Sequence, residues 1–368
     1  MSGNVILVTG AAGFIGSSLV IALSENFRVI GIDKRKPSTA LLKAAKHVKW
    51  IELNIGNAAE VNSAFQQIIS DYGKIDFIVH LAAYYHFGID WQEEYEYTNI
   101  VGTKNICNAA AKFGAQRIIF SSSIAALEPP EKGEYLNEGS PTSDFIPYAR
   151  SKSDGENIIK SASSVIPATI LRLGGVFSDW CELPPLYSLI RLWSSLKPIS
   201  NMIPGKGESG IPYIHIKDVI QIFLRCIALH NNLSNYDIFL ASQNGSVSHS
   251  QLFPIIKTGL NDQGTDNPIY ISKSLAKIAL GFKAKFGRLT GGINFEQPWM
   301  LKYTDQPWIV NNDYTRKKLN WGTNPDLEIL ERLPVILKYY EEQKNQWMSR
   351  NKRRISGRYI YISDQNGV

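Results

Sequence analysis

Residues 9–16 read Thr-Gly-Ala-Ala-Gly-Phe-Ile-Gly and directly follow the apolar run at residues 5–8. Gly10 suits a tight turn, Gly13 lets backbone amides approach a pyrophosphate, and Gly16 permits close contact between a helix and a strand. A helix that opens at this point presents its N-terminus to phosphate charge. The segment therefore predicts a strand, a glycine turn and a helix arranged to bind a dinucleotide.

Short apolar runs alternate with helical patterns through the first half of the chain. Such alternation implies right-handed crossovers and a parallel sheet covered on both faces. We expect an α/β fold, a Rossmann-type doubly wound parallel sheet with a smaller C-terminal substrate-binding domain. The expected strands are 5–9, 28–32, 48–53, 75–81, 117–121 and 168–172, and the expected helices are 14–26, 57–71, 93–113 and 148–162. The expected divisions are 1–178 for nucleotide binding, 179–340 for a substrate-binding region whose chain crosses back to the first domain, and 341–368 for a basic tail.

The net charge of +6, from 39 Lys and Arg against 33 Asp and Glu, is concentrated near the C-terminus. Between Lys344 and Arg358 there are six basic residues and no acidic one, so the rest of the chain carries 33 of each sign. This balance gives no reason to expect a nucleic-acid partner. The three cysteines lack metal spacing, and the apolar start has no basic flank, so we expect no metal and a cytoplasmic protein.

The second expected strand ends at Asp33, about 20 residues into the nucleotide-binding unit. A carboxylate there accepts hydrogen bonds from the adenosine ribose hydroxyls and repels a 2′-phosphate. This favours NAD. Because Lys34 and Arg35 follow immediately and are suited to a phosphate, NADP stays open.

Tyr148 and Lys152 are four residues apart, so on a helix they share one face. An ammonium beside a phenol favours the phenolate form, which accepts a proton in catalysis. Ser121, Ser122 and Ser123 end an upstream strand, and a serine hydroxyl there is suited to holding the substrate oxygen. A Tyr–Lys pair alone is common on surfaces, but its position after the fifth strand of a nucleotide fold favours catalysis.

These motifs together resemble the extended short-chain dehydrogenase/reductase family, also called the NAD-dependent epimerase/dehydratase family. The matching segments are TGAAGFIG, His80-Leu-Ala-Ala83, Asn99-Ile-Val-Gly102-Thr103 and Tyr148 with Lys152. The resemblance implies Ser123, Tyr148 and Lys152 as catalytic residues. It implies cofactor contacts from Gly10, Gly13, Phe14, Ile15, Gly16, Asp33, Lys34, Asn54, Ile55, Leu81, Ala82, Ala83, Asn99, Tyr148 and Lys152.

The departures from this family concern the substrate. Sugar 4,6-dehydratases carry an Asp-Glu pair after the catalytic hydroxyl, whereas Ile124 and Ala125 follow Ser123 here. Nucleotide-sugar epimerases typically place an arginine before the Tyr-Ile-His segment, where this chain has Ile211 and Pro212. Residues 180–193 are strongly apolar. We therefore expect an oxidoreductase that acts on a secondary alcohol or ketone of a moderately hydrophobic small molecule, nearer to 3β-hydroxysteroid dehydrogenases and dihydroflavonol reductases.

Two alternatives stay open: a nucleotide-sugar epimerase with tightly bound NAD, and a non-catalytic NAD(P)-sensing module. Residues 273–289 combine apolar and basic positions at helical spacing. That pattern fits a core-packed helix or, equally, contact with an anionic membrane surface, and the tail offers a second possible membrane contact. The resemblance also implies a homodimer.

Overall fold

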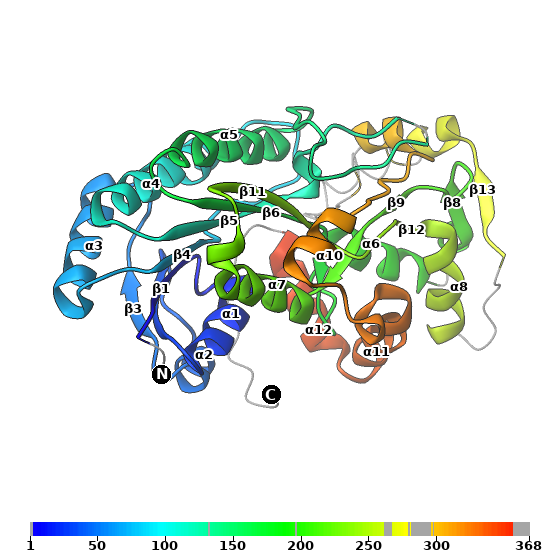
Figure 1. The fold of residues 1–368 in the computed structure, drawn as a ribbon. Coiled ribbons are helices and arrows are strands. Elements are labelled where there is room, and N and C mark those ends of the chain that lie inside the picture. Colours follow the sequence, from blue (N-terminus) through cyan, green and yellow to red (C-terminus); the bar gives the residue numbers. More distant parts are fainter. Residues whose placement is uncertain are drawn as a thin grey trace.

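A seven-stranded sheet forms the centre of the computed structural model, which describes residues 3–131, 133–195, 197–260, 267–278, 280, 296 and 298–355. The strand order is β11-β6-β5-β4-β1-β2-β3, and every neighbouring pair is parallel (Figure 1). The strands are β1 (Val5–Thr9), β2 (Arg28–Asp33), β3 (Lys49–Glu52), β4 (Phe77–His80), β5 (Arg117–Ser123), β6 (Ala168–Leu173) and β11 (Tyr236–Ala241).

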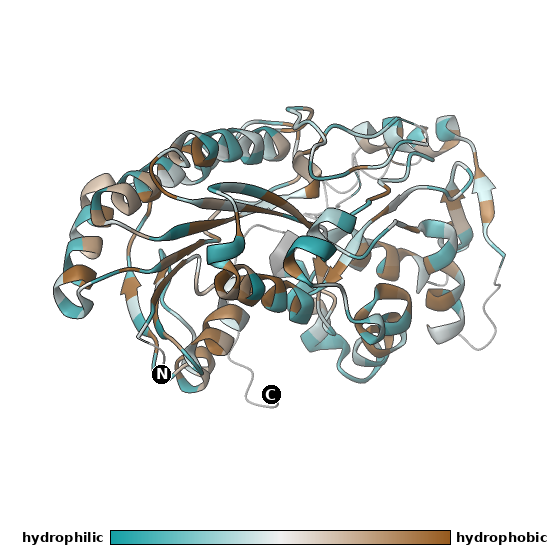
Figure 2. Ribbon diagram, in the orientation of Figure 1, coloured by the Kyte–Doolittle hydropathy of each residue, from teal (hydrophilic) through white to brown (hydrophobic). Residues whose placement is uncertain are grey.

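Helices cover both faces of this sheet (Figure 1). One face packs against α3 (Ala58–Tyr72), α4 (Gly102–Phe113) and α5 (Pro147–Ala162). The other packs against α1 (Phe14–Ser24), α2 (Thr39–Ala44) and α7 (Ile216–Ala228). The strands read as hydrophobic and the outward sides of the helices as hydrophilic in Figure 2, as expected for a sheet buried on both faces. The expected Rossmann-type fold is confirmed.

Local sequence signals set several helix ends. The side chain of Asn57 accepts hydrogen bonds from Ala59 N and Glu60 N, and so caps the start of α3. Gly73 and Gly114 end α3 and α4 with φ of 77° and 71°, in the left-handed region that glycine adopts without strain. These caps are why the expected helices 57–71 and 93–113 end within a residue or so of the observed ones.

Several elements of this region were not expected from the sequence, including the helices α2 and α7. Residues 93–113 form two helices instead of one, because the π-helix η1 (Tyr95–Val101) precedes α4. The strand β11 pairs with β6 from Tyr236↔Ala168 to Ala241↔Leu173, so the chain returns to the sheet late. Its edge is covered by α10 (Asp313–Leu319), where Thr315 Oγ1 accepts a hydrogen bond from Leu240 N at 2.8 Å.

The rest of the second half consists of short elements around a separate apolar core. Its strands form the pairs β10–β7, β12–β9 and β13–β8. Their bounds are β7 (Gly175–Phe177), β8 (Met202–Pro204), β9 (Gly210–Ile211), β10 (Tyr213–His215), β12 (Val247–Ser248) and β13 (Ile269–Ile271). The helices of this part are α6 (Pro184–Trp193), α8 (His249–Leu260), α11 (Ile329–Glu342) and α12 (Lys344–Ile355). The short helices of the chain are η2 (Ile124–Ala126), which follows β5, and η3 (Pro198–Asn201), η4 (His230–Asn232), η5 (Pro298–Tyr303) and η6 (Pro325–Leu327).

The expected basic tail is wrong for its first half, because α12 is a packed element. Trp347 is fully buried in the second core, and Asn351 is 1% exposed. Asn351 Oδ1 accepts from Glu182 N at 2.8 Å, and Arg350 Nε donates to Glu182 Oε1 at 3.0 Å. The basic composition of this segment gave no sign that it would be buried. Trp347 and Asn351 nevertheless give α12 a buried face. Residues 356–368 lie outside the described part of the chain.

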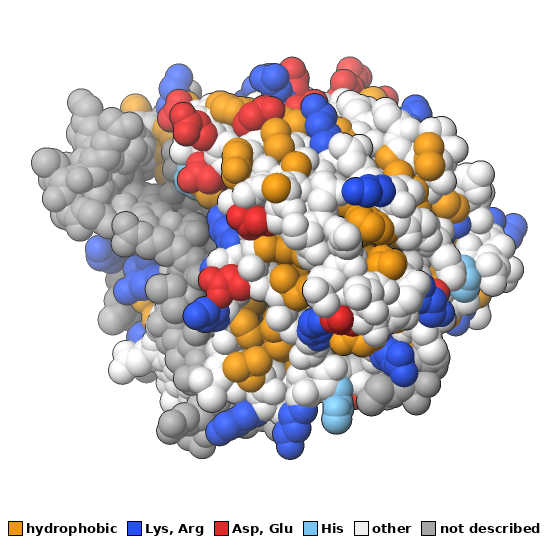
Figure 3. All heavy atoms as spheres, turned by 90° about the vertical axis from the view of Figure 1, so that its left-hand side faces the viewer, with side chains coloured by type: hydrophobic (Ala, Val, Ile, Leu, Met, Phe, Trp, Pro, Cys, Tyr) orange, Lys and Arg blue, Asp and Glu red, His pale blue; other side chains and the backbone are white. Residues whose placement is uncertain are grey.

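The surface shows no segregation of charge on the face drawn in Figure 3, where basic and acidic side chains are interspersed. The expected amphipathic segment 273–289 is described only over 273–278 and 280; Ala276 is buried there, while Leu275 and Ile278 are exposed. Within the described residues no helix has the length and apolar character needed to cross a bilayer.

Candidate active site

The glycine turn lies at the carboxyl end of β1 and is packed too tightly for side chains. Gly10 has φ of 70°, and a Cβ added there would lie 2.7 Å from Ala82 N. A Cβ on Gly16 would lie 2.1 Å from Gly10 O. Among the described residues no side chain caps the N-terminus of α1 at Gly13. The turn is thus a backbone cradle at the N-terminus of a helix, which fits the pyrophosphate of a dinucleotide.

Asp33 lies at the end of β2, where a carboxylate is expected to bind the adenosine ribose. Its side chain is 7% exposed, and its Oδ2 accepts from Ala12 N at 3.1 Å. Its Oδ1 accepts from Arg35 N at 3.1 Å and from Arg35 Nε at 3.3 Å. Because a carboxylate has about four acceptor sites and three are used here, capacity remains for one ribose hydroxyl. Lys34 and Arg35 line the same end of the cavity.

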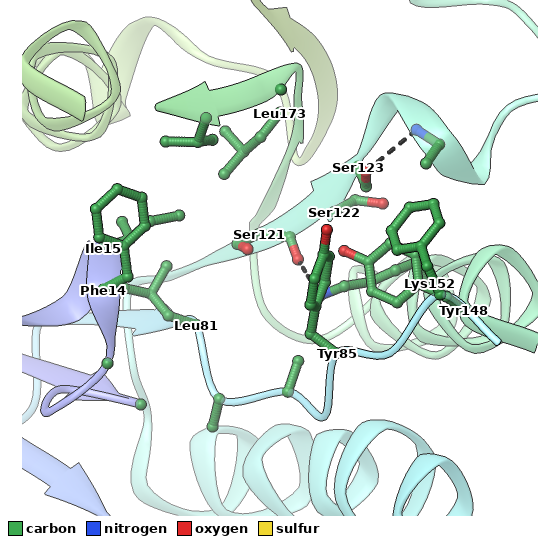
Figure 4. Close-up of a pocket in the computed structure, with 18 of the residues that line it drawn as sticks. Phe14, Ile15, Leu81, Tyr85, Ser121, Ser122, Ser123, Tyr148, Lys152 and Leu173 are labelled. Atoms are coloured by element: carbon green, nitrogen blue, oxygen red, sulfur yellow. Dashed lines mark hydrogen bonds between the residues drawn. The ribbon is translucent and has the colours of Figure 1, made fainter. Parts of the chain in front are cut away.

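Tyr148 and Lys152 project from the first turns of α5, which begins at Pro147 (Figure 4). Lys152 is 4% exposed, and its Nζ donates to Ser121 O at 2.8 Å. Burial lowers the pKa of Lys152 from 10.5 to about 8, against the attraction of Glu156, which raises it. An amine with this pKa exchanges its proton near neutral pH, a property common at catalytic sites.

Ser123 ends β5, and its hydroxyl faces the same cavity as Tyr148 (Figure 4). Its Oγ accepts from Ala125 N at 3.1 Å, which leaves the hydroxyl hydrogen free to be donated. The neighbouring Ser122 has a different role, since its hydroxyl donates to Glu156 Oε1 at 2.5 Å. The strand therefore directs Ser123 towards the cavity and Ser122 towards a buried ion pair.

That ion pair excludes Arg172 as a substrate contact. Arg172 Nε and Nη2 donate to the Glu156 carboxylate at 3.0 and 2.8 Å, with both side chains about 95% buried. The pair fixes α5 to β6 beneath the catalytic residues. Arg191 lies over the Tyr187 ring, with its guanidinium carbon 5.5 Å from the ring centroid, and does not line the cavity.

The glycine turn, Asp33, Ser123, Tyr148 and Lys152 all line one cavity of about 450 Å³. It brings together the three catalytic candidates and all the cofactor-binding candidates except Asn99. The Asn99 amide is used within the protein: Oδ1 accepts from Tyr84 N at 2.6 Å, and Nδ2 donates to Tyr84 O and to Ser151 Oγ. Asn99 therefore positions the segment that follows β4 against α5. Of the apolar segment 180–193, Leu183 and Pro185 line the cavity, whereas Tyr187 and Trp193 are buried in the second core.

The sequence reading missed the aromatic residues of this cavity. They come from the loop after β4, from the residues before α5 and from the segment 298–308, and they are Tyr85, Phe87, Phe145, Trp299, Tyr303 and Trp308. The clustering of aromatic residues between 84 and 97 was a usable signal for the first group. The others are brought in by long-range packing, for which the sequence has no local signal.

His80 links the end of β1 to the first turn of α4. Its Nδ1 lies 2.6 Å from Thr9 Oγ1, and its Nε2 lies 3.0 Å from Thr103 Oγ1. Because Thr103 donates its hydroxyl hydrogen to Asn99 O at 2.6 Å, it must accept from His80 Nε2. Burial lowers the pKa of His80 from 6.5 to about 3, so the ring is neutral and its hydrogen bonds have a fixed direction.

A parallel Rossmann sheet with a glycine cradle, and with a serine, a tyrosine and a buried lysine facing one cavity, defines a nucleotide-dependent oxidoreductase of the short-chain dehydrogenase type. The chain belongs to the NAD dependent epimerase/dehydratase family, whose model matches residues 6–241. It is accordingly an NAD-dependent enzyme.

Individual relatives are more distant. The mouse dTDP-D-glucose 4,6-dehydratase is 27% identical over 60% of this chain and 63% of its own length. A putative UDP-glucose 4-epimerase of Methanocaldococcus jannaschii is 26% identical, over 80% of this chain and 98% of that protein. The structure of dTDP-glucose 4,6-dehydratase from Bacillus anthracis in complex with NAD superimposes with a TM-score of 0.68 at 17% identity, covering 94% of this chain and 99% of that one.

These relatives correct one expectation. The sequence reading placed the chain nearer to steroid and flavonol reductases, whereas these matches are to nucleotide-sugar epimerases and dehydratases. The apolar composition of residues 180–193 suggested the former, but most of that segment builds the second core instead of the cavity wall. The placement on the steroid side is therefore not supported.

Proposed function

We propose that this enzyme oxidises a secondary alcohol to a ketone and reduces the ketone again within the same site, as an epimerase does. The observation that carries the proposal is the identity of the residues after Ser123. Ile124 and Ala125 line the cavity there, where 4,6-dehydratases carry an acid and a base. Without these two groups water elimination has no proton donor or acceptor, and the oxidation–reduction chemistry of the family remains.

The chain's own side chains account for the proton movements. Tyr148 takes the proton of the substrate hydroxyl as a hydride leaves the same carbon, so that a C=O bond replaces H–C–O–H. NAD, when bound, would supply the hydride acceptor for the oxidation and the hydride donor for the reduction. Lys152 keeps two N–H groups besides the one on Ser121 O, enough for Tyr148 and a ribose hydroxyl. Ser123 donates to the substrate oxygen in both directions.

The residues expected to hold NAD support this assignment. Gly10, Gly13 and Gly16 shape the pyrophosphate cradle, and Asp33 receives the adenosine ribose. The backbone and side chains of Asn54 and Ile55 lie beside them, at the place suited to the adenine. Gly56 N already donates to Asn54 Oδ1 at 3.0 Å, so that oxygen is held in a fixed position.

The retention of NAD tests the epimerase proposal without knowledge of the substrate. An epimerase that regenerates NAD in each turnover keeps it bound, so the purified protein should retain close to one NAD per chain after gel filtration. Enantiopure 1-tetralol and UDP-glucose are then supplied as probes, with stereochemistry at the carbinol carbon and absorbance of NADH as readouts. Inversion without accumulation of NADH supports the proposal, and the Tyr148→Phe variant should show none while still retaining NAD.

A second function, a dehydrogenase that exchanges its cofactor, is favoured by one observation, the aromatic lining of the substrate end. It predicts NAD lost on gel filtration and one NADH released for each ketone formed. Either result would replace the epimerase proposal. Normal turnover by Tyr148→Phe would refute both, since each depends on this phenol.

A further inference from the structure

The end of the cavity that lies beyond Tyr148 is walled by aromatic rings. Tyr85 and Phe87 lie against Tyr148, with ring centroids 5.0 and 5.2 Å from its own. Figure 4 shows Tyr85 and Tyr148 side by side over Lys152. These rings form one side of what we call the aromatic chamber. Both Tyr85 and Phe87 are half-buried.

A second side of the aromatic chamber is built around Phe145. Its ring centroid lies 6.3 Å from that of Trp299, 5.6 Å from Tyr303 and 6.0 Å from Trp308. All four are half-buried and line the cavity. Because Phe145 is three residues before Tyr148, this side also lies close to the reacting position.

The segment carrying Trp299, Tyr303 and Trp308 is held in place by Asp305. The Asp305 Oδ1 atom accepts from Lys206 N at 2.8 Å and from Glu208 N at 3.3 Å. Both amides belong to a turn in which Gly205 and Gly207 have φ of 74° and 76°. Successive amides in such a turn form a concave anion site. Here the site is filled by a carboxylate of the chain itself, so it fixes the aromatic wall and is not open to a substrate phosphate.

Charge is scarce at this end of the cavity. Among the described residues that line it, the charged side chains are Asp33, Lys34 and Arg35 at the adenosine end and Lys152 beneath Tyr148. Ile211 and Pro212 line the wall where an arginine would meet a diphosphate. A diphosphate without a cationic partner loses hydration that nothing replaces, whereas a neutral ring gains by covering half-buried aromatic faces.

We propose that the aromatic chamber binds a neutral ring-bearing alcohol or ketone, in place of a nucleoside diphosphate sugar. The inference rests on the proposed function, because it assumes that the reacting carbinol carbon lies at Tyr148. The ring system would pack against Tyr85 and Phe87 and against Phe145 with its neighbours, all of which line the cavity. Lys152 and Ser123 then supply the polar contacts that the alcohol oxygen needs.

Binding to the NAD-saturated protein tests this substrate class, with 1-tetralone as the neutral probe and UDP-glucose as the nucleotide-sugar probe. We expect 1-tetralone to bind at one site per chain and to raise the melting temperature, and UDP-glucose to leave it unchanged. Stabilisation by UDP-glucose, or by neither probe, would overturn the proposal. The comparison uses the wild-type protein, so it does not depend on any variant folding.

A matched pair of variants locates the site. Tyr303→Ala removes a ring of the aromatic chamber and should weaken 1-tetralone binding about tenfold. Tyr135→Ala removes an exposed tyrosine outside the cavity and should bind as the wild type does. Equal binding by the two variants would place the ligand elsewhere. No turnover enters these measurements, so retained binding with failed hydride exchange would refute the proposed function alone.

Discussion

Replacing Lys152 by methionine should inactivate the enzyme and at the same time stabilise its cofactor-free fold. Lys152 is 4% exposed, and burial lowers its pKa from 10.5 to about 8. Below pH 8 the folded protein holds this ammonium away from water, whereas the unfolded chain hydrates it. At 1.36 kcal/mol per pKa unit, the fall corresponds to about 3 kcal/mol of lost stability.

The gain from Lys152→Met is smaller than this cost, because the methionine also loses a contact. The Nζ hydrogen bond to Ser121 O contributes about 1 kcal/mol. Methionine is unbranched and of similar length, so it fills the same space beside the Phe120 ring, which now lies 5.1 Å from Nζ. The net expectation is a stabilisation of about 1–2 kcal/mol at pH 7.

Urea denaturation of NAD-free protein between pH 7 and 10.5 measures this difference. The unfolded lysine binds its proton up to about pH 10.5 and the folded one only up to about pH 8. The wild type should therefore gain stability relative to Lys152→Met as the pH rises through this window, until the advantage of the variant is lost. Lys152→Arg, which keeps the charge at every pH, should be less stable than the wild type. A methionine variant that is less stable at pH 7, by an amount independent of pH, would refute the reasoning.

Three further predictions follow from buried groups. Trp347→Ala should lower the free energy of unfolding by about 3–5 kcal/mol, because the side chain is fully buried; a loss under 1 kcal/mol in urea denaturation would show that α12 is dispensable. Glu156→Gln should cost about 3–5 kcal/mol by leaving Arg172 buried without its counterion, and an unchanged melting temperature would contradict that role. The neutral His80, with a pKa of about 3 against 6.5 when unfolded, should make the wild type lose up to about 5 kcal/mol as the pH falls through that range. A His80→Gln variant should lack this component, and identical acid titrations of stability for the two proteins would argue against it.

Local sequence signals were sufficient where structure is decided locally. The glycine pattern at residues 9–16, the carboxylate at Asp33 and the four-residue spacing of Tyr148 and Lys152 each depend on a single element, and the structure brings all of them to one cavity. Most strands of the first half were predictable because they contain an apolar run bounded by polar residues, although β3 is the shorter Lys-Trp-Ile-Glu. Nucleotide binding at the carboxyl edge of the sheet then follows from topology.

The rest depended on contacts between distant residues. Asn99 was predicted to touch the cofactor, but the π-helix directs its amide to Tyr84 and Ser151. Trp299 and Trp308 of the aromatic chamber are more than 140 residues from Tyr148 in sequence, so no local sequence pattern predicts that they line the same cavity. The same applies to α12, where a strongly basic composition concealed the burial of one tryptophan.

The late return of the chain to the sheet has a consequence for synthesis on the ribosome. β6 ends at Leu173, and its partner β11 begins at Tyr236, roughly 60 residues later. At about 5–20 residues per second, β6 waits roughly 3–12 s with β5 on one side and its other edge unpaired. Thr315, which covers β11, arrives later still. The nucleotide-binding half therefore emerges as an incomplete sheet, and this interval is when a nascent chain of this protein most needs a chaperone.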